Sequence, residues 1–313
     1  MKTKLTKSPT EAAEFVKRGG IAAFPTETVY GLGASVFDES AIAAIFEAKR
    51  RPADNPLIAH IADLAQIKSI TSKVTENAEK FIDVFFPGPL TIVLPKSDAV
   101  PKIATAGLDT IGIRMPRFDI ARQFIEACGT PVVAPSANLS GRPSPTTWQA
   151  VAEDLDGRID CILMAEATEI GLESTVVDCS GAVPILLRAG SVSLAQLQEI
   201  VPETLLYNPL RNEPPKSPGL RHKHYSPRAA VILLNRDEII NAGPQSAFIG
   251  FSEPDGHFAL IRICDSVDDY AHSVFEFFRE CDRRGITAVY CEMIEETGIG
   301  AALMDRLRRA AEK

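Results

Sequence analysis

The amino-acid sequence predicts an α/β protein with two domains, and three observations support this prediction. First, the chain has 313 residues, which exceeds the roughly 100 to 200 residues of a usual single domain. Second, segments with helical periodicity alternate with short apolar segments typical of strands. Third, the segment 208–228 holds five prolines and no apolar periodicity, which marks a connection between domains. We therefore expect a larger domain at 1–207, a linker at 208–228 and a smaller domain at 229–313.

The first domain begins with a helix whose start is encoded by three residues. Ser8 and Glu11 have the spacing of a capping box, and Pro9 lies at the first helical position between them. We expect this helix to stop at the glycine pair 19–20 and a strand to follow at 21–24.

The rest of the first domain continues the alternation of helices and strands. Helices are predicted at 39–49, 75–86, 118–128, 147–155 and 193–200. Strands are predicted at 56–61, 90–95, 110–116, 131–137, 161–165, 174–179 and 184–189. Because these are more strands than simple βαβ repetition supplies, we expect a mixed, twisted sheet.

The second domain is predicted as a smaller, Rossmann-like α/β unit. Its strands are expected at 229–235, 247–251, 257–263 and 286–293. An amphipathic helix at 268–285 has Ser266 as its cap and ends at Gly285, and a closing helix covers 299–313.

The composition is that of an ordinary globular protein, with 45% hydrophobic and 24% charged residues. No apolar run approaches the about 18 residues of a membrane span, and the N-terminal segment lacks the apolar core of a signal peptide. We therefore expect a cytoplasmic protein without membrane contact. The six cysteines lie singly, mostly inside apolar segments, which predicts reduced thiols in the core.

The negative charge is concentrated in the second domain. Residues 229–313 include 15 Asp and Glu against 9 Lys and Arg, whereas the rest of the chain has 26 against 24. An acidic surface repels phosphate backbones, so a nucleic-acid-binding protein would have to confine its basic groups to a patch on the first domain.

The familiar motifs of nucleotide, zinc and acyl-serine chemistry are absent from the sequence. It contains no GxxxxGK[ST] loop, no GxGxxG, no HExxH and no GxSxG elbow. If phosphates bind to this chain, they are bound by other groups.

Polar residues occur where predicted strands run into loops. In FPTETVYGLG, Thr26, Glu27 and Thr28 follow a strand and precede a turn made flexible by glycines. This arrangement fits a ligand-binding turn and a structural turn with a helix cap equally well.

The segment AKRRPADNPLIAHI places several cations at the end of a predicted helix. Lys49 and Arg51 are candidates for anion binding, whereas Arg50 is better explained as a complement to the helix dipole. Asn55 follows in a turn. His60 follows in an apolar strand, where a hydrogen-bonded core histidine is the simpler interpretation.

Two arginines lie in apolar strands, and hydroxyl groups gather in the neighbouring loops. Arg114 and Arg188 need an anionic partner or several carbonyls if they are buried. The short polar side chains in the loops are Ser136, Asn138, Ser140, Ser144, Ser174 and Thr175. Together they predict a concave site for a phosphate-bearing ligand and a small polar partner, with no obvious nucleophile or metal cage.

Seven motifs in order resemble the Sua5/YrdC family of threonylcarbamoyl-AMP synthases. They are FPTETVYGLGA, KRRPADNPLIAHI, FFPGPLTIVL, IGIRMP, PSANLSGRPSPT, ESTVVD and LLRAG. The linker motif SPGLRHKHYSP and the trailing α/β domain resemble the two-domain Sua5 form rather than the single-domain YrdC form. The resemblance therefore implies a YrdC-like catalytic domain followed by a Sua5 C-terminal domain.

The resemblance also implies a reaction. The amine of L-threonine combines with bicarbonate, and the resulting N-carboxythreonine attacks the α-phosphate of ATP, which is bound with Mg²⁺, so that pyrophosphate leaves. Such a transfer depends on positioning and charge stabilisation, so no covalent nucleophile is needed. The product, threonylcarbamoyl-AMP, is expected to pass to a threonylcarbamoyl transferase for t6A37 modification of tRNAs that read ANN codons. Direct tRNA binding by this chain stays open.

Site roles follow from the resemblance, motif by motif. The expected catalytic residues are Lys49 and Arg51. The expected threonine pocket consists of Thr28, His60, Thr110, Arg114 and Ser174, with Arg114 pairing with the carboxylate. The expected ATP contacts are Arg51, Asn55, Ala134, Ser136, Ser144, Arg188 and Tyr225. No metal ligand of the protein is implied, and Arg50 replaces a glycine that is common in the family.

The basic part of the linker is expected to close over the nucleotide. The residues expected to meet the nucleotide and its phosphates are Arg221, His222, Lys223, His224 and Tyr225. A segment in this position would exclude water from a labile carbamate. A solvated basic linker is the alternative.

Two other functions are weighed against the synthase. One is an RNA-binding module without catalysis, whose binding would weaken steeply with salt. The other is a carbamoyl transferase that uses carbamoyl phosphate, a type that normally carries acylphosphatase and zinc-finger modules. This sequence has neither paired cysteines nor such extensions.

Overall fold

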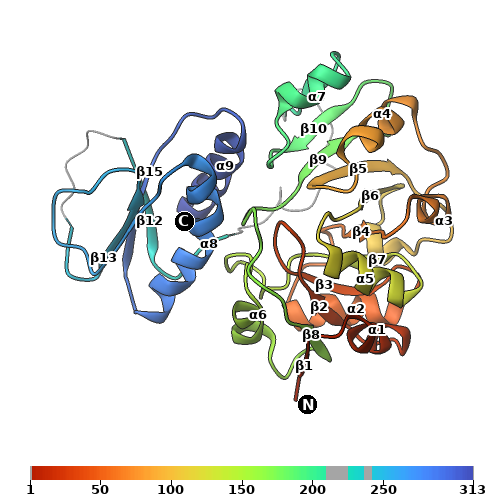
Figure 1. Cartoon of the computed structure of the whole chain (residues 1–313), viewed down its shortest axis with the longest axis horizontal. Helices are drawn as coiled ribbons and strands as arrows, with labels where there is room; N and C mark the ends of the chain where they lie inside the picture. Colours follow the sequence, from red (N-terminus) through yellow and green to blue (C-terminus); the bar gives the residue numbers. More distant parts are fainter. Residues whose placement is uncertain (1, 209–224, 236–241, 313) are drawn as a thin grey trace.

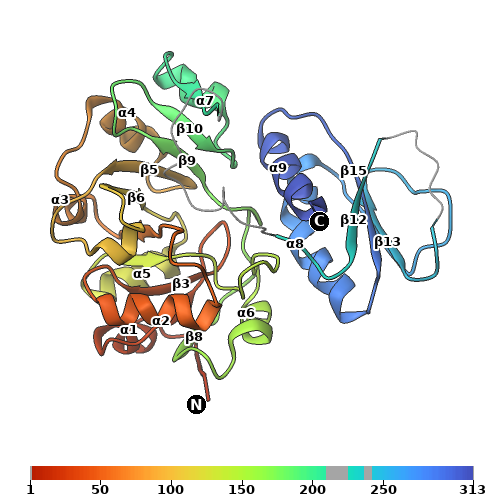
Figure 2. The ribbon, with the colours of Figure 1, turned by 180° about the vertical axis from the view of Figure 1, so that it is seen from behind.

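The computed structural model describes residues 2–208, 225–235 and 242–312. The chain forms two α/β lobes, one around an eleven-stranded sheet and one around a four-stranded sheet (Figure 1). The linker residues 221–224, predicted to meet the nucleotide, lie outside the described residues. Helices α8 (Val267–Arg283) and α9 (Ile299–Ala311) lie between the second sheet and the first lobe, as Figure 2 shows from behind.

The first sheet is mixed, as predicted. Its strand order is β1-β8-β2-β3-β7-β4-β6-β5-β9-β10-β11. Five neighbouring pairs are parallel and five are antiparallel. The strands are β1 (Lys4–Thr6), β2 (Ala22–Phe24), β3 (Gly31–Ser35), β4 (Ile58–His60), β5 (Leu90–Pro95), β6 (Thr110–Arg114), β7 (Val132–Ala134), β8 (Cys161–Leu163), β9 (Thr175–Asp178), β10 (Ile185–Arg188) and β11 (Leu205–Leu206).

Helices cover both faces of this sheet. Helix α1 (Pro9–Lys17) and helix α5 (Asp119–Cys128) share a core with Phe24 of β2. The neighbouring residue Ala23 points into a second core, because side chains alternate along a strand. The helices that contribute to this second core are α2 (Glu39–Lys49), α3 (Ile67–Ile70), α4 (Glu76–Phe85), α6 (Trp148–Leu155) and α7 (Leu194–Ile200). Two short 3₁₀ helices, η1 (Leu64–Gln66) and η2 (Lys102–Thr105), complete the domain.

The start of α1 follows the prediction only in part. Ser8 caps the helix by accepting a hydrogen bond of 3.2 Å from the amide of Glu11, and Pro9 is the first helical residue. The reciprocal half of the capping box is wrong, because the Glu11 carboxylate accepts from Thr6 Oγ1 and lies 3.0 Å from Lys4 Nζ. Strand β1, which the sequence analysis did not predict, brings these two competing partners to Glu11.

The glycine-rich stretch after Thr28 is a strand rather than a flexible turn. Gly31 begins β3, and Gly33 lies inside it, opposite Ala22. A Cβ atom at Gly33 would lie only 2.5 Å from Cγ1 of Val132. Glycine is therefore needed here for close packing against the neighbouring strand and not for turn geometry.

The second domain has a parallel sheet of order β12-β15-β13-β14. Its strands are β12 (Ala230–Leu234), β13 (Ser246–Gly250), β14 (Leu260–Ile263) and β15 (Ala288–Glu292). As predicted, Ser266 caps α8 with a hydrogen bond to the amide of Asp269, and Gly285 follows its end with a φ of 67°. Tyr270 and Phe275 of α8 pack with Leu303 of α9 in the core of this domain.

The six cysteines are free and buried, which confirms the prediction of reduced core thiols. Burial raises the pKa of Cys128 and Cys161 to about 12, so both stay protonated at neutral pH. Within residues 2–208, 225–235 and 242–312, none of the helices has the length and apolar character to cross a bilayer.

Candidate active site

A cavity opens where loops at the ends of several strands of the first sheet converge. Ten of the thirteen predicted site residues line it: Thr28, Arg51, His60, Arg114, Ala134, Ser136, Ser144, Ser174, Arg188 and Tyr225. The other three, Lys49, Asn55 and Thr110, are buried but are not among the residues that line it.

Arg114, at the end of β6, is held in place by three groups. Its Nε donates to the carbonyl of Gly88 at 3.2 Å, and one terminal nitrogen donates to Oγ1 of Thr28 at 2.7 Å. The other terminal nitrogen lies 2.8 Å from the carboxylate of Glu27. A guanidinium has five N–H donors, so, within the described part of the chain, donors on both terminal nitrogens are left for a ligand.

The Glu27 carboxylate stays ionised although it is buried. Burial alone raises the pKa of this group, but the charge and hydrogen bond of Arg114 outweigh it and hold the pKa below its usual value. The loop after β2 therefore contributes a fixed negative charge behind Arg114.

His60 is neutral in this environment. Burial and, secondly, the charge of Arg114 lower the pKa of its imidazole to about 3. Nδ1 lies 3.1 Å from the carbonyl oxygen of Ile58, so Nδ1 carries the proton and Nε2 is an acceptor. The ring of Phe24 packs edge-on against the imidazole, with 5.5 Å between the ring centroids. A neutral acceptor of this kind can bind an ammonium or hydroxyl group.

Arg188 and Ser174 connect two neighbouring strands at the cavity wall. Nε of Arg188 donates to the carbonyl of Ser174 at 3.0 Å, and a terminal nitrogen donates to its Oγ at 3.1 Å. Oγ of Ser174 also lies 2.8 Å from Oγ1 of Thr91. Burial lowers the pKa of Arg188, but a guanidinium stays protonated in proteins, so the wall keeps its positive charge.

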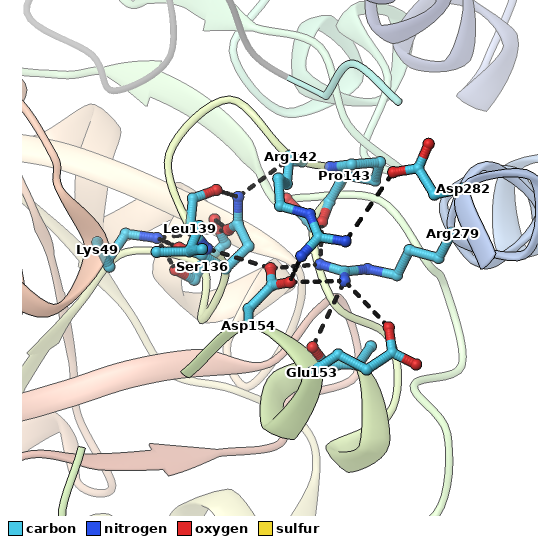
Figure 3. Close-up of polar contacts among 12 residues, drawn as sticks. Lys49, Ser136, Leu139, Arg142, Pro143, Glu153, Asp154, Arg279 and Asp282 are labelled. Atoms are coloured by element: carbon cyan, nitrogen blue, oxygen red, sulfur yellow. Dashed lines mark hydrogen bonds and ion pairs between the residues drawn. The ribbon is translucent and has the colours of Figure 1, made fainter. Parts of the chain in front are cut away.

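Residues 136–144 follow β7 and form one side of the cavity; we call them the site loop. The loop is folded around Asn138, whose side-chain amide donates to the carbonyls of Leu139 at 2.9 Å and Arg142 at 2.8 Å. Oγ of Ser136 donates to Oδ1 of Asn138 at 2.6 Å. The ammonium of Lys49 donates to the carbonyl of Ser136, as Figure 3 shows, and also to the carbonyl of Asn138.

Lys49 thus acts on the cavity through the site loop. The residue is 1% exposed, and its ammonium contacts the far side of the loop. Burial and then the charge of Arg51 lower the pKa of Lys49 well below its usual value. Arg51 itself faces the cavity and donates to the carbonyls of Asn55 and Pro56 at 3.4 Å. Burial lowers the pKa of Arg51 to about 10, so it is cationic at neutral pH.

Positive charge dominates the cavity walls. The arginines that line the cavity are Arg51, Arg114, Arg142 and Arg188. Within the described part of the chain, Glu173 is the one carboxylate among the lining residues. Burial raises the pKa of Glu173, but Arg306 and Arg188 outweigh this effect and keep it ionised. The remaining excess of positive charge suits a polyanion such as a triphosphate.

A residue of the linker lines the same cavity and is held by the second domain. Tyr225, at the end of the linker, lines it with a left-handed φ of 68°. The phenol ring stacks on Phe275 of α8 at 5.4 Å, and the guanidinium of Arg306 on α9 lies 5.3 Å from the ring centroid. The second domain therefore supports the cavity wall through Tyr225.

Charged residues around the cavity were missed by the sequence analysis. They are Arg142, Asp154, Glu173, Arg279 and Arg306. For Arg279 a signal exists, because it lies four residues after Phe275 and thus on the apolar stripe of α8. A buried arginine on such a stripe requires an acidic partner.

Comparisons with known proteins find relatives that match both domains of the chain. Residues 14–190 match the Sua5/YciO/YrdC family, described under the heading "Telomere recombination", and residues 192–312 match "Threonylcarbamoyl-AMP synthase, C-terminal domain". The chain is 42% identical to a threonylcarbamoyl-AMP synthase of Pyrococcus abyssi, over 96% of this chain and 93% of the relative. It is 38% identical to that of Bacillus subtilis, over 96% and 92%.

A solved structure extends the likeness to three dimensions. It is P. abyssi Sua5 complexed with L-threonine, which superposes with a TM-score of 0.91 at 40% identity, over 99% of this chain and 96% of that one. The sequence and structure comparisons cover both domains. The chain belongs to the Sua5/YrdC family, in its two-domain Sua5 form, and its activity is that of a threonylcarbamoyl-AMP synthase.

Proposed function

We propose that the chain makes threonylcarbamoyl-AMP in this cavity by two consecutive bond-forming steps. The amine of L-threonine and bicarbonate first give N-carboxythreonine and water. A carboxylate oxygen of this carbamate then attacks the α-phosphorus of ATP, the bond to the β-phosphate oxygen breaks, and pyrophosphate leaves. Neither step needs a covalent intermediate with the protein, because positioning and charge stabilisation account for such transfers.

The threonine subsite is proposed to lie around Arg114 and His60. The remaining donors of Arg114 would pair with the threonine carboxylate, and Glu27 would hold the guanidinium in the required orientation. Nε2 of neutral His60 would accept from the amine or the hydroxyl of threonine. The hydroxyls of Thr28 and Ser174 would complete this subsite, and the buried Thr110 would support it.

The nucleotide subsite is proposed to lie between the site loop and the arginines of the other walls. Arg51 and Arg188 would neutralise the triphosphate, and Ser136 and Ser144 would donate to it. Ala134 would offer backbone groups at the base of the loop, and Asn55 would fix the segment next to Arg51. The two proposed catalytic residues have different roles. Arg51 faces the cavity, whereas Lys49 holds the site loop.

Mg²⁺ is proposed to enter as the complex with ATP. The described residues contain no group of three His, Cys, Asp or Glu side chains placed to hold an ion by themselves. Mg²⁺ keeps several waters and commonly binds through substrate phosphates, so the triphosphate and water would be its main ligands. Its charge would assist the departure of pyrophosphate.

The domain division is proposed to be 1–207 for catalysis, 208–228 for a lid and 229–313 for support of that lid. Tyr225 carries the lid proposal, because it joins the cavity wall to the core of the second domain. Replacing Lys223 and Tyr225 together by alanine should lower turnover or increase release of the intermediate.

We further propose a cytoplasmic location and a threonylcarbamoyl transferase acting on tRNA as the recipient of the product. A mixed anhydride of a carbamate and AMP is prone to hydrolysis, so a transferase must consume it promptly. The final modification would be t6A37 in tRNAs that read ANN codons.

The observation that carries this function is the excess of arginine over carboxylate in a cavity rich in hydroxyl groups. It is tested by measuring pyrophosphate release from ATP and Mg²⁺ while L-threonine and bicarbonate are each supplied or withheld. The proposal is supported if pyrophosphate is released only when L-threonine and bicarbonate are both present. ATP hydrolysis that occurs whether or not L-threonine and bicarbonate are present would contradict the proposal.

A further inference from the structure

Two arginines of the second domain are buried at the boundary with the first domain. Arg279 on α8 has 0% of its surface exposed, and Arg306 on α9 has 1%. Neither of them lines the cavity. Burying a charged guanidinium is costly unless it is fully paired, so the contacts of these two side chains show what the boundary is built to hold.

Arg279 contacts the site loop directly, and it also binds Asp154 of α6, which in turn binds the loop. Its terminal nitrogens lie 2.9 and 3.2 Å from the two oxygens of Asp154, and one of them also donates to the carbonyl of Pro143 (Figure 3). The same carboxylate accepts from the amide of Leu139 at 3.1 Å and from the guanidinium of Arg142. Three positions of the loop are thus tied to one buried ion pair.

Arg306 acts on the end of the same loop. Its Nε lies 3.0 Å from Oε2 of Glu173, whose Oε1 accepts from the hydroxyl of Ser144. A terminal nitrogen of Arg306 donates to the carbonyl of Ala189 at 3.1 Å. The chain leaving the linker adds a further tie, because the amide of Ser226 donates to the carbonyl of Gly141 at 3.0 Å.

The site loop also lines the cavity. Ser136, Asn138, Arg142 and Ser144 line it, and Lys49 holds the loop from the first domain. The loop is therefore held from both domains. The ion pair of Arg114 and Glu27, by contrast, receives no hydrogen bond or ion pair from the second domain among the described residues.

We propose that Arg279 and Arg306 are positioning residues for the nucleotide subsite, and that the second domain supports the catalytic conformation of the site loop in addition to holding the linker. The proposal rests on the assignment of the site loop to ATP under the proposed function. A hydrogen bond to a charged group such as a phosphate contributes about tenfold to a hundredfold in affinity. Loss of this support should therefore weaken ATP binding and leave threonine binding largely intact.

The test compares substitutions of Arg279 in the full-length chain. Arg279→Met removes the charge, and Arg279→Lys keeps the charge but loses the planar fork that spans Asp154 and Pro143. The matched control is Arg283→Met, because Arg283 lies on the same helix and also crosses to the first domain, 3.0 Å from Glu153, without touching the site loop. Calorimetry gives the Kd of Mg·ATP and of L-threonine for each variant, and steady-state assays give KM and kcat.

The expected result is a split between the two ligands. In Arg279→Met the Kd of Mg·ATP should rise by about tenfold to a hundredfold, whereas that of L-threonine should change less than about twofold. In Arg279→Lys the Kd of Mg·ATP should lie between the values of Arg279→Met and the wild type. In Arg283→Met it should equal the wild-type value. In an Asp154→Asn background the further effect of Arg279→Met should be much smaller, since both side chains belong to one unit.

Other outcomes would overturn the inference. They are an unchanged Kd for ATP in Arg279→Met, equal weakening of both ligands, or an equal effect in Arg283→Met, which would mean simple domain docking. If Arg279→Met no longer binds threonine because it is unfolded, Arg279→Lys decides by the same criteria. Failure of the proposed function is recognised separately, because the wild type itself would then release no pyrophosphate that depends on threonine and bicarbonate.

Discussion

Arg114 and Glu27 form an ion pair with 2.8 Å between nitrogen and oxygen, and both side chains are almost fully buried in the first domain. Such a pair is costly to desolvate and is weak evidence for stability by itself. It makes sense at a binding site, where the carboxylate orients the guanidinium and a ligand takes the remaining donors.

Glu27→Gln tests this arrangement. Removing one partner of a buried pair costs about 3 to 5 kcal/mol, so the free energy of unfolding in urea should fall by roughly this amount. L-threonine should then raise the Tm of the variant more than that of the wild type, because its carboxylate replaces the missing charge. Glu11→Gln, which alters an exposed pair with Lys4, serves as the control. Equal threonine shifts in Glu27→Gln and wild type would argue against a threonine carboxylate at Arg114.

Lys49→Met tests whether Lys49 works through the site loop. The substitution leaves the carbonyls of Ser136 and Asn138 without their buried donor, and each unsatisfied group costs about 1 to 3 kcal/mol. We expect a lower Tm and a higher KM for ATP, with the Kd of threonine nearly unchanged. A variant that keeps the wild-type Tm and KM for ATP but loses kcat would instead indicate direct contact of Lys49 with the reacting phosphate.

The neutrality of His60 has a measurable consequence for stability. The pKa is about 3 in the folded chain and about 6.5 in the unfolded chain. Between these values the unfolded state binds the extra proton, so stability from this group is complete above pH 6.5 and is lost as the pH falls toward 3. The contribution amounts to about 1.4 kcal/mol per pH unit. His60→Gln should flatten the dependence of unfolding free energy on pH between about 4 and 6 by this amount. An unchanged slope would mean that His60 is protonated in the folded chain.

Much of the fold was predictable because local patterns and tertiary structure agree. Helix α2 has the predicted bounds 39–49, and α8 has its predicted cap at Ser266 and its stop at Gly285. Strands that pack in both cores read as short apolar runs, which periodicity and flanking turns identify. The order of the strands in the sheet could not be predicted, because it depends on pairing between segments that are far apart in the sequence.

The errors have particular physical causes. Gly33 was assigned to a flexible turn, but the side chain of Val132 on the adjacent strand β7 leaves no space for a Cβ there. Glu11 was assigned to a capping box, but Lys4 and Thr6 compete for its carboxylate once β1 has formed. Both cases required knowledge of which strands lie side by side.

The candidate site was predictable where its residues lie in local motifs and not where it spans the domains. Arg188 was found as a charge in an apolar strand, and the structure places it in the cavity wall. Arg279 has the same signal on helix α8, but its partner Asp154 lies 125 residues earlier in the sequence. Only the folded arrangement of the two domains brings the pair together beneath the site loop.

The central claim is that threonine, bicarbonate and ATP are joined in the cavity of the first domain. The most direct measurement is mass spectrometry of the nucleotide product formed from L-threonine, Mg·ATP and ¹³C-labelled bicarbonate, read within seconds of mixing. We expect threonylcarbamoyl-AMP whose mass rises by one unit with the label, formed together with pyrophosphate and lost in Arg114→Lys. ADP and phosphate as the products, or an adenylate that carries no carbon from bicarbonate, would contradict the claim.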